Sequence, residues 1–394
     1  MTISEFLLFI SDRALTNPKS YFQPGQNGPY NDPETAVRNY GHWLITFSKC
    51  FELTGEQIYL KKIKELAEYL ISDDARPHGF SFHHRSKEGK DRCNGLIGQA
   101  WTLEALICAS SILGDTRYAE LGEEVFFQHK FNAEFGLWNR LETDGGFLSI
   151  DDTFNHQLWF ASCAALLNTP RGEEVRERIF RFMNCLLENL SVLDNGLIYH
   201  PIERRLNQND SRLSIKSKLR NVVESLLPIS LKRKGQSRHN NNELREKMIY
   251  KSVGYHQFNM YAFAILKETL PDHSFWLSPE FGRLVDYLLS NEFKNEVSDN
   301  IYGYPYNPPG FEVPFALSVL TSYSEDELVG ISSWWVNEQL KRCYNPETKM
   351  MDRNTEDYRT HTARIYEVTR LPISILNTIK IKTQSLGDSS QVFY

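Results

Sequence analysis

Side chains suited to acid–base chemistry gather at residues 149–156, Ser-Ile-Asp-Asp-Thr-Phe-Asn-His, at the start of a predicted helix. Asp152, Asn155, His156 and Trp159 follow i, i+3, i+4 and i+7 spacing, which places them on one helical face. A carboxylate held among aromatic rings is desolvated, and desolvation favours the protonated form that a general acid needs. We therefore predict that Asp152 is the general acid/base of a glycoside hydrolase.

Two other carboxylates bear on this prediction. Glu312, at the start of a later predicted helix, is the expected partner of Asp152, although a carboxylate there also interacts well with the helix dipole. Asp151 fits an N-cap, because its carboxylate can accept hydrogen bonds from the first backbone N–H groups of the helix.

A second set of groups supports different chemistry. Asn155 with His156, and Tyr255 with His256, supply amide, imidazole and phenol groups. Such a set suits proton abstraction beside a carboxylate, as in a polysaccharide lyase or a uronate C5-epimerase. A histidine at such a position is also often a structural hydrogen-bonding residue. The catalytic candidates are Asp152, His156, Tyr255 and Glu312.

These groups belong to a repeated pattern, in which six polar and aromatic clusters each precede an apolar helical stretch. The clusters begin at residues 38, 94, 152, 255, 309 and 361. A unit of this length cannot bury its own apolar face, so neighbouring units must stack. If all six starts lie at one end of a ring, they converge on one mouth. The predicted substrate-binding residues are Asn39, His42, Trp43, His83, Asn94, Gln99, Trp101, Trp138, Asn155, Trp159, His256, Asn259, Tyr304 and Arg364.

Each unit is predicted to hold an inner and an outer helix. Inner stretches such as 100–111 are apolar nearly all round, whereas outer stretches such as 59–70 have one charged face. This difference predicts an all-α fold, an (α/α)6 toroid that forms a single domain over residues 1–394. The predicted pairs are 38–53 with 56–72, 94–112 with 116–130, 152–167 with 172–193, 255–269 with 278–292, 312–323 with 325–343, and 361–369 with 3–15.

Long loops join each outer helix to the next inner helix. Aromatic stretches recur in them at 79–84, 136–140, 196–200 and 301–306, which predicts short β-hairpins on one rim. Loops that recur on one face of such a ring usually form its binding surface.

One segment interrupts the repeat, a basic insertion at residues 204–251 between the third and fourth units. It contains 13 Lys and Arg against 4 Asp and Glu. The insertion is either a solvated helix with a loop, or a lid that recruits an acidic glycan.

The composition of the chain limits the kinds of partner and compartment that we predict. The formal charge of -6 gives no general phosphate-binding footprint, so no nucleic-acid partner is predicted. Residues 1–15 lack the basic start of a signal peptide, and no run of 18 apolar residues predicts a membrane span. We expect a cytoplasmic protein with six free cysteines, no metal and no cofactor. The sequence does not predict an oligomeric state.

The six helix starts and the aromatic loops, over residues 38 to about 370, resemble the six-hairpin glycosidase superfamily. This group includes unsaturated glucuronyl and rhamnogalacturonyl hydrolases, N-acylglucosamine epimerases and several polysaccharide lyases. Residues 150–154 are similar to the Asp-Asp-Leu-Phe stretch of the hydrolases, in which an Asp is the general acid/base. The resemblance assigns this role to Asp152, or to Asp151 if the register shifts by one residue.

Other stretches depart from the hydrolase pattern. Thr153 stands where the hydrolases have Leu, and Asn155 and His156 replace a Met-centred continuation. Residues 94–118 resemble the helical domain of glucuronyl C5-epimerases, and the Asn155-His156 pair is similar to the Asn/His/Tyr sets of toroid lyases. We predict a hydrolase of an acidic oligo- or polysaccharide, with a lyase or an epimerase as the first alternative. A non-catalytic ring that binds a glycan or a protein is the second.

Overall fold

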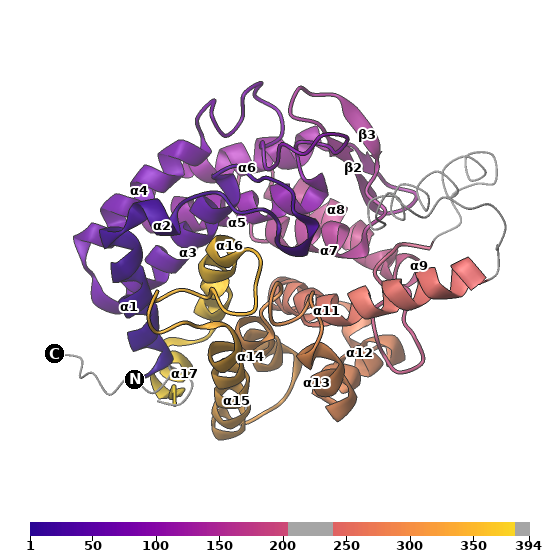
Figure 1. The fold of residues 1–394 in the computed structure, drawn as a ribbon. Coiled ribbons are helices and arrows are strands. Elements are labelled where there is room, and N and C mark those ends of the chain that lie inside the picture. The colour runs from indigo at the N-terminus through magenta and orange to yellow at the C-terminus, as the bar shows by residue number, and fades with distance from the viewer. Residues whose placement is uncertain (204–238, 383–394) are drawn as a thin grey trace.

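Six inner helical segments follow one another around a ring in a computed structural model that describes residues 1–203 and 239–382 (Figure 1). Each segment contacts the next, and the last contacts the first, so the ring is closed within the described part of the chain. The inner segments are α3 (Val37–Thr54), α5 (Gly95–Leu113), α7 (Phe154–Ala164), α11 (His239–Thr269), α14 (Pro309–Leu320), and α16 (Tyr358–Ala363) continued by the 3-10 helix η3 (Arg364–Arg370).

A second layer of helices packs outside the first (Figure 1). Helix α1 lies against α3 and α17, which places the N-terminal helix beside the last hairpin, as predicted. The (α/α)6 toroid is therefore confirmed. The outer helices are α1 (Ile3–Thr16), α4 (Gln57–Leu70), α6 (Thr116–Gln128), α8 (Gly172–Asn184), α12 (Pro279–Leu289) and α15 (Glu325–Cys343), accompanied by the shorter α2 (Pro18–Tyr21), α9 (Leu186–Asn189), α13 (Asn291–Ser298), α17 (Ile373–Thr378) and η2 (Ser274–Leu277). The 3-10 helix η1 (Gly28–Tyr30) belongs to the segment before α3.

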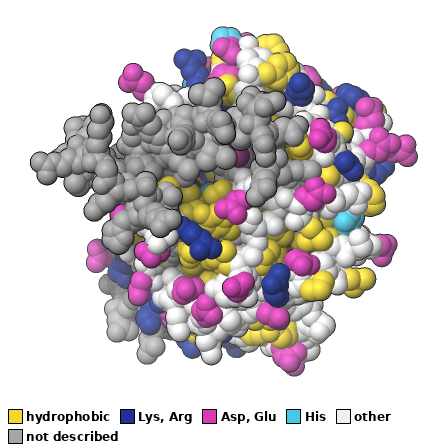
Figure 2. All heavy atoms as spheres, turned by 90° about the vertical axis from the view of Figure 1, so that its right-hand side faces the viewer, with side chains coloured by type: hydrophobic (Ala, Val, Ile, Leu, Met, Phe, Trp, Pro, Cys, Tyr) yellow, Lys and Arg dark blue, Asp and Glu magenta, His cyan; other side chains and the backbone are white. Residues whose placement is uncertain are grey.

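The two layers differ in burial as their sequences predict. Helix α5 is long and apolar enough to cross a membrane by length and composition alone. It lies between α3 and α7 in the inner layer, and 67% of its most apolar window is buried. Its apolar character is thus explained by contacts on both sides within the ring. Charged side chains of both signs are interspersed on the outer face shown in Figure 2.

Helix ends follow local sequence signals. Helix α3 ends at Gly55, whose φ of 70° is the left-handed conformation that glycine adopts without strain. Helix α15 begins with a capping box, in which Ser324 and Glu327 bond each other's backbone N–H. These signals explain why the predicted bounds of α15 agree with the structure.

One rim carries a three-stranded antiparallel sheet of β1 (Phe131–Asn132), β2 (Leu137–Leu141) and β3 (Phe147–Ile150). Phe131 pairs with Trp138, and Asn139 pairs with Ile150. The last strand leads directly into Asp151 and α7. The prediction of β-hairpins is wrong for residues 79–84 and 301–306, which contain no strand, and residues 196–200 contribute only the isolated bridge of Ile198 with Val192. Residues 301–306 form consecutive turns, because Gly303 and Tyr306 donate backbone bonds to carbonyls three residues earlier.

Several predicted helix limits also differ. Helix α11 begins at His239, not at 255, so residues 239–251 of the predicted insertion are helical, and residues 204–238 lie outside the described residues. The third outer helix ends at Asn184, and the sixth inner segment is short and partly 3-10. Because α11 is longer than predicted, Lys251 lies on this inner helix, one turn before Tyr255.

Gly310 allows α14 to pack closely on α15. A Cβ atom at this position would lie 2.5 Å from the carbonyl oxygen of Trp335 and would overlap the Gln339 side chain. We expect Gly310→Ala to lower the free energy of unfolding by about 1–3 kcal/mol in urea denaturation. Gly330→Ala is the matched control, because an added Cβ there meets nothing within 4 Å and should raise stability by about 0.5–1 kcal/mol. Equal stability of the two variants would contradict this packing.

Candidate functional site

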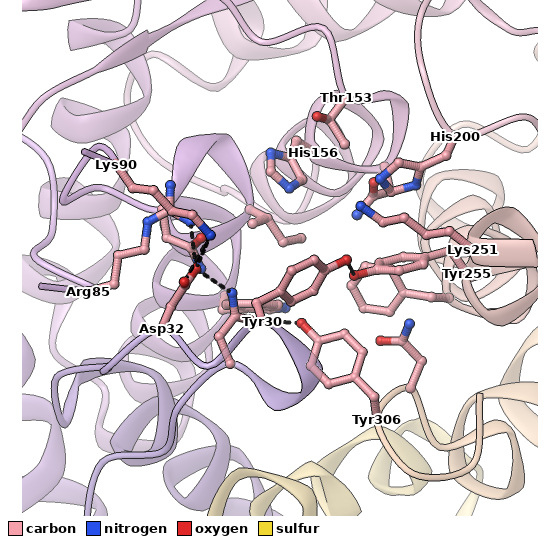
Figure 3. Close-up of a pocket in the computed structure, with 17 residues that line it drawn as sticks. Tyr30, Asp32, Arg85, Lys90, Thr153, His156, His200, Lys251, Tyr255 and Tyr306 are labelled. Carbon is pink, nitrogen blue, oxygen red and sulfur yellow. Dashed lines mark hydrogen bonds and ion pairs between the residues drawn. The ribbon is translucent and has the colours of Figure 1, made fainter. Parts of the chain in front are cut away.

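A cavity of about 150 Å³ lies where several inner segments begin (Figure 3). Its wall combines residues from the start of α5, the start of α7, the middle of α11, the loop before α14 and the segment before α3. The polar starts of the second and third inner helices therefore line the same cavity as residues of the fourth inner helix, α11. The lining residues are Asn27, Tyr30, Asp32, Arg85, Lys90, Asn94, Ile97, Trp101, Thr153, Asn155, His156, His200, Lys251, Tyr255, Phe258, Tyr306 and Asn307.

His156 lines this cavity, and a carboxylate holds its ring in place. Its Nδ1 lies 2.8 Å from Oδ2 of buried Asp151, and the same oxygen accepts a bond from the backbone N–H of Leu96. Nδ1–H is thus directed at Asp151, which leaves Nε2 as the lone-pair nitrogen of the neutral ring. Figure 3 shows the ring pointing into the central space.

Asp151 remains ionised in its buried position. Burial alone would raise the pKa of its carboxyl, but His156, Arg140 and the Leu96 N–H hold that pKa well below its usual range. Arg140 is itself fixed by an ion pair of 2.7 Å with Asp91. This carboxylate therefore serves to orient and stabilise the imidazole, and it is not an N-cap of α7.

Tyrosine side chains form the opposite part of the wall. The hydroxyls of Tyr30 and Tyr255 lie 2.7 Å apart, and the Tyr306 hydroxyl donates to Asn27 at 2.8 Å. Burial and the neighbouring phenols raise the pKa of Tyr255 well above its usual range, so this hydroxyl keeps its proton. In Figure 3, His156 and the Tyr30–Tyr255 pair face the central space from opposite sides.

Lys251 supplies a positive charge to the same space. Its Nζ lies 5.0 Å from the ring centroid of Tyr30 and 5.5 Å from that of Tyr255, within cation–π range. Lys251 forms no ion pair with any carboxylate of the described residues. Burial, with a smaller effect of Lys90, lowers its pKa to about 8. The half-buried ammonium is therefore available to an anionic ligand.

Asp32 is the one carboxylate among the described residues that line the cavity, and it is already paired. Lys90 Nζ lies 2.8 Å from both of its oxygens, and Arg85 Nη1 lies 3.3 Å from Oδ2. Two uncommitted amide atoms lie nearby, since Asn94 Nδ2 and Asn155 Oδ1 are buried without a hydrogen-bond partner. The site therefore offers donors, an acceptor and an excess of positive charge.

The structure brings together only part of the predicted site. Of the catalytic candidates, His156 and Tyr255 line the cavity, whereas Asp152 is exposed and Glu312 is fully buried, and neither of these two lines it. Glu312 forms an ion pair with Arg364. Of the predicted substrate-binding residues, Asn94, Trp101 and Asn155 line this cavity, and His83 lines a neighbouring hollow.

The other predicted substrate-binding residues do not line the cavity, and all of them except Asn259, whose Oδ1 is buried without a hydrogen-bond partner, have side-chain contacts that explain their positions. Asn39 donates to the Gln23 carbonyl, Gln99 bonds the 82–93 loop, and His256 contacts the Leu284 carbonyl. The indoles of Trp43 and Trp159 donate to backbone carbonyls, and Trp138 packs among phenylalanines. His42 stacks on Tyr366, Tyr304 stacks on Trp335, and Asn259 is buried in α11.

Sequence reasoning missed most of the cationic and phenolic groups. Asn27, Tyr30 and Asp32 precede the first repeat, and their Gly/Asn/Pro-rich context carried no helical signal. Lys251 stands four residues before Tyr255, so i, i+4 spacing could have placed both on one face of a longer helix. His200 and Tyr306 end two of the aromatic loop stretches that the sequence predicts to form the binding surface, although neither is among the predicted site residues.

A curated relative places the chain in a family. No protein-family model matches the chain. Archaeal glycosylation protein Q of Haloferax volcanii is 42% identical over 355 residues, covering 88% of this chain and 91% of the relative. The chain belongs to the family of archaeal glycosylation protein Q.

Solved structures agree with this assignment at the level of the fold. D-mannose isomerase matches with a TM-score of 0.60 at 13% identity, covering 93% of this chain and 95% of the other. Cellobiose 2-epimerase of Bacillus thermoamylovorans matches at 0.53 and 11% identity, with coverages of 92% and 100%. An α-1,6-mannanase of Salegentibacter matches at 0.51 and 12%, with coverages of 93% and 97%. The resemblance to six-hairpin enzymes is thus confirmed for the architecture.

The burial of Lys251 should appear in the pH dependence of stability. Below pH 8 the folded protein carries the cost of a desolvated ammonium, and this cost disappears as pH rises from 8 towards the usual value of 10.5. Lys251→Met should therefore gain about 1–2 kcal/mol relative to the parent at pH 7, and this difference should shrink by pH 9.5. Urea denaturation measures both values.

Lys341→Met is the control for this prediction, because its ammonium is exposed on α15 and its stability difference should not depend on pH. A difference for Lys251→Met that stays constant between pH 7 and 9.5 would show that the ammonium does not carry this cost.

Proposed function

We propose that this protein is an enzyme of glycosylation that epimerises an acidic sugar residue by moving the proton on the carbon next to its carboxylate. The observation that carries this proposal is the pair of proton-transfer groups on opposite sides of one cavity. His156, oriented by Asp151, faces the paired hydroxyls of Tyr30 and Tyr255. Inversion at carbon requires removal of a proton from one face and its return to the other, which this arrangement suits.

The first half of the reaction uses His156 and Lys251. Nε2 of His156 takes the proton at C5 of the uronate, and the electron pair moves towards the carboxylate to give an enolate-like intermediate. Lys251, together with the Asn94 amide, stabilises the negative charge that develops on the carboxylate oxygens. Asp151 stabilises the imidazolium that forms.

The second half uses the tyrosines. Tyr255 donates its proton to C5 from the opposite face, and the Tyr30 hydroxyl, 2.7 Å away, hydrogen-bonds the phenolate that results. Nearby Lys251 offsets the charge on that oxygen. The raised pKa of Tyr255 fits this role, because a basic carbanion is protonated by a weak acid and the phenol is fully protonated beforehand.

Glycoside hydrolysis through two carboxylates receives less support from the cavity. That mechanism needs two carboxyl groups beside the scissile bond, at about 5–10 Å from each other. The lining contributes only Asp32 among the described residues, and two cations already pair with it. Asp152 and Glu312, the predicted pair, do not line the same space.

The relatives support a sugar substrate. The curated relative is named a glycosylation protein, and two of the structural neighbours are a sugar epimerase and a sugar isomerase. A variant of the mannanase was solved in complex with mannotriose. An acidic substrate is favoured by the positive charges of Arg85, Lys90 and Lys251 around a single carboxylate.

Hydrolysis is kept as a second candidate for one reason. The inactive mannanase variant has two consecutive aspartates replaced by asparagine, and this chain has consecutive Asp151 and Asp152 at the start of its third inner helix. The two hypotheses differ in the effect of Asp152, which the epimerase mechanism does not use.

Deuterium exchange tests the proposal. In D2O, the protein should replace the C5 proton of a susceptible uronate by deuterium and produce the C5 epimer, as followed by NMR on a panel of glucuronate-, galacturonate- and mannuronate-containing oligosaccharides. His156→Gln should lower exchange at least about 100-fold, because it removes the base. Asp151→Asn should lower it about tenfold or more while leaving substrate affinity largely intact, because it removes the group that orients the base.

Asp152→Asn is the discriminating variant and should retain exchange. Release of reducing ends without deuterium at C5, abolished by Asp152→Asn, would assign hydrolysis instead. An unsaturated uronate absorbing in the far ultraviolet would assign β-elimination. Binding of the panel without any turnover would favour a non-catalytic ring.

A further inference from the structure

A second hollow, of about 490 Å³, opens beside the cavity on the loop that joins α4 to α5. Lys90 lines both spaces, so the hollow and the cavity are neighbours. Its other polar walls are His83, Ser86, Lys87 and Arg92.

The hollow has more positive than negative charge. Lys87, Lys90 and Arg92 line it together with one carboxylate, that of Glu88. Neither Lys87 nor Arg92 forms an ion pair with a carboxylate in the described part of the chain, and Lys87 Nζ donates only to the Asn31 carbonyl, at 2.9 Å. Within the described residues, the side chains of Lys87 and Arg92 therefore have no ion-pair partner, and the nearby Glu142 carboxylate accepts from the backbone N–H of Arg92.

The loop is fixed in place by bonds at its base. Arg85 pairs with Asp91 at 2.9 Å, and Lys90 pairs with Asp32 at 2.8 Å. The backbone N–H of Lys90 donates to the Lys87 carbonyl and closes a turn. The two uncompensated cations are therefore presented by an anchored turn that is tied to the wall of the cavity.

We propose that this hollow is a phosphate subsite, which binds the phosphate of a phosphorylated glycan whose acidic sugar occupies the cavity. This inference rests on the proposed function for the identity of the sugar, but the residues of the subsite are separate from those that move protons. Ammonium groups act as point charges for phosphate, and Arg92 can add a charge-assisted hydrogen bond. A phosphate can present separate non-bridging oxygens to the two cations, and a monoester adds a second negative charge that a carboxylate lacks.

Paired probes test this subsite. Isothermal titration calorimetry compares glucuronate 1-phosphate with glucuronate on the same protein, and we expect the phosphate to bind at least about tenfold more tightly. In the double variant Lys87→Gln/Arg92→Gln this ratio of affinities should fall towards one. The double variant Arg283→Gln/Lys341→Gln, on the outer helices α12 and α15, removes the same two charges and should leave the ratio unchanged.

Two results would overturn the proposal, namely equal affinities of the two probes for the parent protein, or a ratio that survives in the double variant. A tenfold preference that is lost in the double variant supports it. Comparison of the monoester with its ethyl diester then identifies the source. A preference for the monoester indicates a free sugar phosphate, and equal affinity indicates a phosphodiester-linked glycan.

The outcome is separable from that of the proposed function. Loss of the phosphate preference alongside intact deuterium exchange rejects the subsite and retains the epimerase. Phosphate preference without exchange, cleavage or elimination retains the subsite and rejects the catalytic proposal.

Discussion

The guanidinium of Arg364 connects the last inner segment of the ring both to its neighbour α14 and to two residues of the cavity wall. It lies on η3, the last inner segment, and pairs with Glu312 of α14 and with Glu367 of its own turn. It also donates to the Tyr306 carbonyl at 2.9 Å and to the Asn307 side chain at 2.6 Å, and both of these residues line the cavity. Removing one partner of such a buried pair typically costs about 3–5 kcal/mol. The same contacts that close the ring therefore position part of the site.

This cluster also explains why a carboxylate at a helix start need not be catalytic. Burial, and the nearby charge of Glu367, raise the pKa of Glu312 well above its usual range, while burial raises that of Glu367 to about 7 despite Arg364. One guanidinium thus stands between two carboxyl groups that do not both ionise readily. Asp151 has the opposite environment, in which His156 and Arg140 keep it charged. Both carboxylates lie near the start of an inner helix, and the charges around them hold them in opposite protonation states.

The fold could be predicted because helices that stack in the same way repeat the same sequence pattern. The residues of the site could not be predicted from that repeat. The polar residues that mark the repeat largely hold the loops. Gln99 exchanges hydrogen bonds with the backbone of Phe82, and Gln157 does the same with Trp138 one unit later. These amides recur because every loop needs anchoring to its inner helix. A repeated polar residue therefore indicated architecture more often than substrate contact.

The cavity-lining groups that the repeat did not predict come from places where the units differ. Tyr30 and Asp32 lie in a segment that precedes the first hairpin, and Lys251 depends on a longer α11 than its counterparts. A symmetric ring of equal helix starts would present the same chemistry six times, which cannot place a base and an acid on opposite faces of one carbon. In the proposed mechanism, His156 and Tyr255 have distinct roles because Asp151 supports one, whereas Tyr30 and Lys251 surround the other. The departures from the repeat are therefore the reason that opposite sides of this cavity carry different chemical groups.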